Sequence, residues 1–89
     1  MYHAFISAHL QKIIVRLEKK DAQLHEQLLQ KINEIVHAET LDHYKNLRHI
    51  MKDQKRVHIG PFVLVFHSDE KTKTVYFDDF DHHDSIYKK

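Results

Sequence analysis

The sequence contains no cysteine, so it cannot form disulfides, thiolate zinc sites or a cysteine nucleophile. No apolar run approaches the roughly 18 residues that a membrane helix needs. The N-terminus lacks the basic-then-apolar pattern of a secretion signal. We therefore expect a cytoplasmic protein with no membrane partner, in a compartment compatible with reduced thiols.

Glycine and proline are also scarce, with one of each, and the two are adjacent as Gly60-Pro61. Because these residues punctuate most turns, their scarcity predicts long stretches of regular structure. A chain of 89 residues, of which 42% are hydrophobic, suffices for one modest core. We expect a single domain over residues 1–89. The net charge of +1 indicates no particular partner.

The first half of the chain predicts a strand followed by two helices. Met1–Ile6 alternates as a strand does, Ser7 is suited to cap a helix beginning at Ala8, and Asp21 is suited to cap a second helix. Helical spacing places apolar residues on one side of each, first Leu10, Ile13, Ile14 and Leu17, then Leu24, Leu28, Ile32 and Ile35. The short connection predicts an antiparallel helical hairpin.

In the second half of the chain, the spacing of apolar residues changes from that of helices to that of strands. Residues 38–54 show no clear period, and we expect them to be irregular. Three strands are predicted after them, at Lys55–Ile59, Phe62–Phe66 and Val75–Phe80, with a charged tail over residues 81–89. The continuous apolar run Phe62–Phe66 is typical of a central strand buried on both faces. The predicted fold is α+β with two layers in the order β-α-α-β-β-β, in which the helical hairpin covers one face of an antiparallel sheet and leaves the other open to a ligand.

A cluster of cations lies between Tyr44 and His58. It contains Lys45, Arg48, Lys52, Lys55 and Arg56, with one acidic residue, Asp53, and two histidines, His49 and His58. Such clusters bind phosphate backbones with release of counterions. The alternative interpretation is a solvated loop with ordinary surface charges.

Near the C-terminus the charge of the side chains becomes mainly negative. Four aspartates, Asp78, Asp79, Asp81 and Asp84, surround His82 and His83. A carboxylate beside an imidazole raises its pKa, as a general acid near neutral pH requires. The segment is alternatively an acidic edge that pairs with the basic cluster, or a divalent metal site. A metal chelate from both histidines would need a bend, because adjacent strand residues point to opposite faces.

The order of elements, together with several segments, resembles the RelE/ParE superfamily of toxins, particularly its RelE-like and YafQ-like branches. The segments are 44–48 (YKNLR), 55–60 (KRVHIG), 62–66 (FVLVF) and 81–87 (DHHDSIY). The resemblance covers nearly the whole chain and implies the RelE-like fold. It implies a toxin of a type II toxin–antitoxin system that cuts messenger RNA in the ribosomal A site.

The resemblance also implies chemistry and partners. The ribose 2′-hydroxyl attacks the adjacent phosphate, a base takes its proton, cations stabilise the phosphorane and an acid protonates the leaving 5′-oxygen, without metal or other cofactor. A cognate antitoxin would wrap over the toxin, and a toxin–antitoxin heterotetramer is one assembly that the resemblance allows.

Site residues follow from the same resemblance. His58 and His83 match histidine positions of the YafQ-like active site, and Tyr87 matches a C-terminal aromatic position. Lys52, Lys55 and Arg56 match a basic segment that contacts phosphate, Arg48 and His49 lie near a loop histidine or lysine, and Lys45 belongs to the same basic cluster. Whether His82 or His83 is the general acid stays open at this point.

One position departs from the family pattern. Many RelE-like enzymes carry an arginine where this chain has Val63, or Phe62 if the register differs. Arg56 or Arg48 is a candidate to replace it. The missing arginine favours one alternative function, a non-catalytic binding module of the same fold. A second alternative is a ParE-like toxin that binds DNA gyrase, against which the His58 and His83 pair argues.

Overall fold

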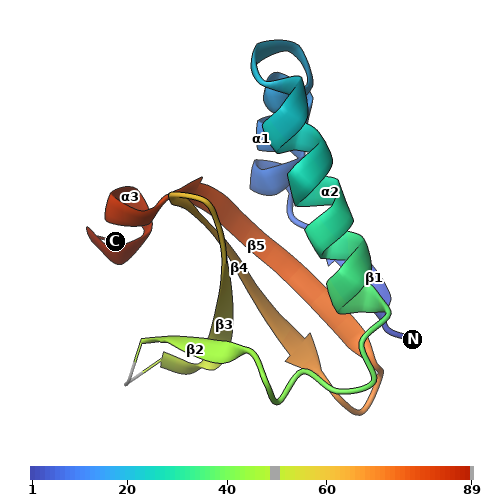
Figure 1. Cartoon of the computed structure of the whole chain (residues 1–89). Helices are drawn as coiled ribbons and strands as arrows, with labels where there is room; N and C mark the ends of the chain where they lie inside the picture. Colours follow the sequence, from blue (N-terminus) through green and yellow to red (C-terminus); the bar gives the residue numbers. More distant parts are fainter. Residues whose placement is uncertain (49–50, 89) are drawn as a thin grey trace.

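A computed structural model describes residues 1–48 and 51–88, with side chains except at positions 47, 48, 51 and 52. It has a helical hairpin, a five-stranded sheet and a short C-terminal helix (Figure 1). The elements in chain order are β1 (His3–Ile6), α1 (Ala8–Lys20), α2 (Ala22–Val36), β2 (Lys45–Arg48), β3 (Met51–Ile59), β4 (Phe62–Asp69), β5 (Thr74–His82) and α3 (His83–Lys88). The predicted α+β class is confirmed.

Both helices of the hairpin begin where the capping residues predicted. The Ser7 hydroxyl accepts a hydrogen bond from Leu10 N, and the Asp21 carboxylate accepts one from Leu24 N. These bonds satisfy amide groups that have no partner inside the helix. The longest helix, α2, has 15 residues, and no described helix combines the length and hydropathy needed to cross a membrane.

The strands lie in the order β1-β5-β4-β3-β2. Strands β2 to β5 pair antiparallel in succession, but β1 runs parallel to β5, so the sheet is mixed rather than purely antiparallel. The helical hairpin returns the chain to the start of β1, where the Tyr2 amide donates a hydrogen bond to the Val36 carbonyl at 2.8 Å.

Strand β4 is central and buried on both faces, as its apolar run predicted. Leu64 and Phe66 join the main core beneath the helical hairpin, whereas Val63 and Val65 form a second cluster with Ile86 of α3. We call the side of the sheet that carries Val63 and Val65 the open face, since the hairpin leaves it uncovered. Figure 1 shows α3 lying away from the hairpin.

Two segments differ from the prediction. Residues 38–54 are not irregular throughout, because β2 and the first half of β3 lie there. An edge strand such as β2 is held by backbone pairing to β3, and its side chains need no apolar alternation. The tail also forms the end of β5 and all of α3, a helix too short to be evident from its period. The turn at Gly60 has φ of 58°, which glycine adopts without strain.

Candidate active site on the open face

The strongest candidate site is formed by two histidines that are far apart in the sequence. His58 lies near the end of β3, and His83 is the first residue of α3. Their rings stack with centroids 5.7 Å apart and planes inclined by 24°. The amide of His83 donates a hydrogen bond of 2.9 Å to the carbonyl of Pro61, which ties the start of α3 to the β3–β4 turn.

Strand register places Arg56 beside this histidine pair. Arg56 lies opposite Val65, and His58 lies opposite Val63, so both side chains share the open face with the valines. Because Ile86 packs on the same valines, α3 brings His83 to that face too. The open face therefore carries three residues that the sequence indicated as site residues, His58, His83 and Arg56.

Tyr87 lies on the other side of His83. Its ring centroid is 4.6 Å from that of His83, and the side chain packs against the cluster of Val63, Val65 and Ile86. Tyr87 is thus both an anchor for α3 and the outer member of a row of three rings. Such a row presents aromatic surface next to the histidines.

His82 does not join the pair. It lies opposite Phe62 in the β4–β5 ladder, with the two rings in edge contact at 5.8 Å, and Phe62 packs against the main core. Its Nδ1 accepts a hydrogen bond from the Asp84 amide. His82 ends β5 and contacts Phe62, whereas His83 begins α3 and stacks on His58, so the geometry favours His83 over His82 as the partner of His58.

The surroundings of His58 favour its neutral form. Partial desolvation, the Arg56 guanidinium and, to a smaller extent, His83 all lower the pKa of the His58 imidazole below its ordinary value of 6.5. A neutral imidazole has a free ring nitrogen that can accept a proton at neutral pH. His58 therefore has the properties of a general base.

Arg56 carries a donor without a partner. Its Nε atom is buried and has no hydrogen-bond acceptor in the described part of the chain. A buried donor left unpaired destabilises the protein, and an anion at this position would supply the missing acceptor. Arg56 is thus suited to bind a phosphate oxygen beside His58.

The remaining members of the predicted basic cluster separate. Lys45 of β2 lies opposite Arg56 of β3 in the strand register, so its side chain lies on the open face, where it is exposed. Lys55 faces the other way, opposite Phe66, and its Nζ donates to the carbonyl of Tyr44 at 3.1 Å. Lys55 therefore lies on the face of the sheet opposite to the histidine pair. Arg48 lies in β2 and Lys52 in β3 without described side chains, and His49 lies outside the described residues.

The aspartates near the C-terminus have partners that the sequence did not indicate. Asp78 binds His67 Nδ1 at 2.7 Å, and Asp79 binds His9 Nε2 at 2.9 Å. Asp84 lies near the two consecutive histidines, with its carboxylate 3.5 Å from His83 Nδ1 and 3.9 Å from His82 Nδ1, and the Asp81 carboxylate accepts a hydrogen bond from the His82 amide at 2.8 Å. Roles for His9 and His67 were missed because both pairs join residues from different elements.

Val63 is the position, with Phe62 as the alternative register, at which the family resemblance would place an arginine. It is fully buried beneath α3 in the cluster with Val65 and Ile86. A guanidinium could not lie there without displacing the helix that carries His83. The structure therefore assigns the cation near the histidine pair to Arg56, on the neighbouring strand.

Within residues 1–48 and 51–88, no group of three or more acidic or histidine side chains is arranged to hold a metal ion. The chain's own groups at the site comprise a neutral imidazole, a second imidazole, a guanidinium with a free donor and an aromatic ring. Together they can exchange protons with a phosphate ester, bind its oxygens and stack on a base.

Comparisons with known proteins agree with this fold. No family model matches the sequence. A protein from Methanocaldococcus jannaschii named "Putative toxin RelE4" is 52% identical over 90 residues, covering all of this chain and 94% of that protein. An uncharacterized protein from Methanosarcina mazei is 43% identical over 88 residues, covering 98% of this chain and all of that protein.

Solved structures show the same architecture at low identity. The Mycobacterium tuberculosis toxin–antitoxin complex RelBE2 matches with a TM-score of 0.74 and 17% identity, over 92% of this chain and 98% of the other. The isolated Escherichia coli RelE toxin matches with a TM-score of 0.70 and 16% identity, over 92% of this chain and 84% of the other. At such identities these matches establish the fold alone.

Proposed function

Because the chain belongs to the RelE-like branch of the RelE/ParE toxin superfamily, we propose that it is the toxin of a type II toxin–antitoxin system. We further propose that it is an endoribonuclease that cleaves messenger RNA in the ribosomal A site. The observation that carries this proposal is the convergence of His58, His83 and Arg56 on the uncovered face of the sheet.

The reaction follows from the properties of these three groups. Neutral His58 takes the proton of a ribose 2′-hydroxyl, and the 2′-oxygen forms a bond to the adjacent phosphorus. Protonated His83 gives its proton to the 5′-oxygen as the bond from phosphorus to that oxygen breaks. The products are a 2′,3′-cyclic phosphate and a free 5′-hydroxyl. One proton enters the pair and one leaves, so only the positions of the charges on the histidines change.

Arg56 supports the same step electrostatically. The phosphorane carries more negative charge than the starting diester, and a guanidinium fixed beside it stabilises that charge. A phosphate oxygen bound here would accept a hydrogen bond from the Arg56 Nε donor, which has no other acceptor among the described residues. Lys45 adds a second cation on the open face, and the ring of Tyr87 offers a stacking surface for a base.

A cognate antitoxin is the proposed protein partner. Two of the structural relatives were solved with one, the RelBE2 complex from M. tuberculosis and E. coli RelE bound to an antitoxin RelB peptide. The exposed site on the open face must be covered to silence the toxin. We propose that the antitoxin does this, in a complex that includes a heterotetramer of two toxins and two antitoxins.

The two adjacent histidines provide a matched test. His58→Gln, His83→Gln and His82→Gln would each be added with messenger RNA to purified ribosomes, and RNA 5′ ends would be mapped. We expect the first two substitutions to slow cleavage by about 10²- to 10⁴-fold, the usual contribution of a general acid or base. His82→Gln should leave the rate close to that of the unchanged chain.

The same experiment can reject the proposal. If the wild-type chain leaves messenger RNA intact, or if His82→Gln slows cleavage as much as His83→Gln, the assigned chemistry is wrong. A wild-type chain that cuts no RNA but causes gyrase-linked DNA breaks would instead support the gyrase-binding alternative.

A further inference from the structure

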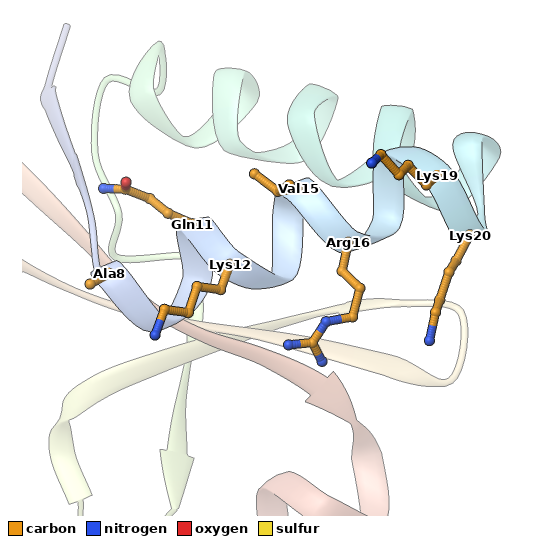
Figure 2. A pocket seen from close by; sticks show the side chains of 7 residues that line it. All are labelled: Ala8, Gln11, Lys12, Val15, Arg16, Lys19 and Lys20. Carbon is orange, nitrogen blue, oxygen red and sulfur yellow. The ribbon is translucent and has the colours of Figure 1, made fainter.

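The outer side of α1 carries a row of cations that the proposed active site does not use. We call it the α1 cationic stripe, and it consists of Lys12, Arg16, Lys19 and Lys20, all of them exposed. The spacing of four, three and one residues places them along one side of the helix. Figure 2 shows the side chains of Lys12, Arg16 and Lys20 extending from one edge of α1, with that of Lys19 at the other edge, and no acidic residue lines the hollow beside them.

The four cations of the stripe are unpaired within the part of the chain that the structure describes. None of the four makes an ion pair or hydrogen bond among the described residues. Arg16 has a like charge one turn before it, at Lys12, and one turn after it, at Lys20, and such pairs destabilise a helix. Lys19 and Lys20 lie in the last turn, where they favourably meet the negative end of the helix dipole. That explanation does not apply to Lys12 or Arg16.

The stripe borders two hollows of the surface. The first is a shallow hollow of about 640 Å³ on α1. Arg16 and Lys20 also line a second hollow of about 230 Å³, whose other side includes Phe62 of β4 and, near the end of β5, Phe80 and the acidic Asp81. Phe62 follows Pro61, the residue whose carbonyl holds the amide of His83. The second hollow lies on the hairpin side of the sheet, because Phe62 and Phe80 pack in the main core, whereas the histidine pair lies on the open face.

We propose that the α1 cationic stripe binds the phosphate backbone of base-paired RNA. Three of its four cations are lysines, which are depleted at the centres of protein–protein interfaces but are used widely on phosphates. The stripe contains no aromatic residue, whereas binding of single strands relies on aromatic stacking. The largest apolar side chain in the hollow beside the stripe is Val15, which is a poor anchor for a protein partner.

This inference rests on the proposed function in one respect, which is that the bound polymer is RNA. Duplex binding needs neither His58 nor His83, since a surface that neutralises phosphates does no chemistry. The stripe would hold structured RNA in place independently of its sequence, while the open face receives a single strand. The two activities can therefore fail separately.

Fluorescence anisotropy of the full chain with a labelled RNA duplex tests the stripe. The double variant Lys12→Gln/Arg16→Gln keeps good helix formers and removes the two cations that the helix dipole does not explain. We expect its duplex affinity to fall by at least about tenfold near 0.1 M salt. The slope of log affinity against log salt should decrease by about two, one for each phosphate that the variant no longer neutralises.

The control is Lys71→Gln/Lys73→Gln, which removes the same charge from the β4–β5 turn. It should bind the duplex as the wild type does, and His83→Gln should as well. Unchanged duplex binding by the α1 variant, or an equal loss of affinity in the α1 and control variants, would overturn the proposal. Tighter binding of an oligoglutamate peptide than of the duplex, abolished in Lys12→Gln/Arg16→Gln, would also overturn it and identify a protein-docking surface. Duplex binding by a wild-type chain that cannot cleave RNA would refute only the proposed function.

Discussion

The position of His83 depends on one buried side chain. Helix α3 has six residues, and Ile86 is its buried member, 3% exposed against Val63 and Val65 of β4. A helix of this length is not stable alone, because nucleation costs more than so few hydrogen bonds return. We therefore expect Ile86→Ala to release α3, and His83 with it, from the open face.

The size of the effect can be worked from the packing of Ile86. The substitution removes three buried carbon groups, each contributing about 0.8 kcal/mol, so docking weakens by about 2.4 kcal/mol. A terminal helix can settle into the space, and the additional cost of a cavity is small. Since 1.4 kcal/mol corresponds to about a factor of ten, the docking equilibrium should shift by about 50-fold toward the released state.

Amide hydrogen exchange measured by NMR would report this shift directly. Protection of the α3 amides should fall by about the same 50-fold factor, because local opening governs exchange there. The pKa of the His58 ring should rise, as His83 and part of the surrounding desolvation are removed. Cleavage of messenger RNA should fall with the docked population.

A matched control is Val15→Ala on the exposed side of α1, where the side chain is 62% exposed and its removal uncovers little apolar surface. It should leave the α3 amides as protected as before. If Ile86→Ala also leaves them protected, or if it lowers global stability while His58 titrates unchanged, then α3 is held by something other than the packing of Ile86.

Three further predictions concern Lys55, Arg56 and His58 of β3. Lys55→Met should lower the free energy of unfolding by about 1 kcal/mol, since it removes the hydrogen bond to Tyr44 O, and should leave RNA affinity unchanged; chemical denaturation and RNA titration would separate the two effects. Arg56→Gln should raise the pKa of His58 toward 6.5 in an NMR titration, because one cause of its depression is removed. The pKa of His58 is lower in the folded chain than in the unfolded chain, so the unfolded chain binds a proton on this ring first as the pH falls below 6.5. The free energy of unfolding should therefore decrease below that pH. His58→Gln should abolish this decrease.

The helical hairpin was predictable because its signals are local. Ser7 and Asp21 cap the helices through bonds to residues only three positions away, and the apolar spacing within each helix marks its buried side. The same holds for β4, where an uninterrupted apolar run can be stable only in the middle of a sheet. No long-range information was needed for any of these elements.

The sequence by itself also determined the candidate residues His58, His83 and Arg56, through their place in a family pattern. Only the tertiary structure decided that these three share one face, that His82 and Lys55 turn away, and that Asp78 and Asp79 bind His67 and His9 instead. Side-chain direction in a strand reverses with every residue, so a shift of one position in register exchanges the two faces. Register, in turn, is set by which strands pair and which helix covers them, and residues distant in the sequence decide both.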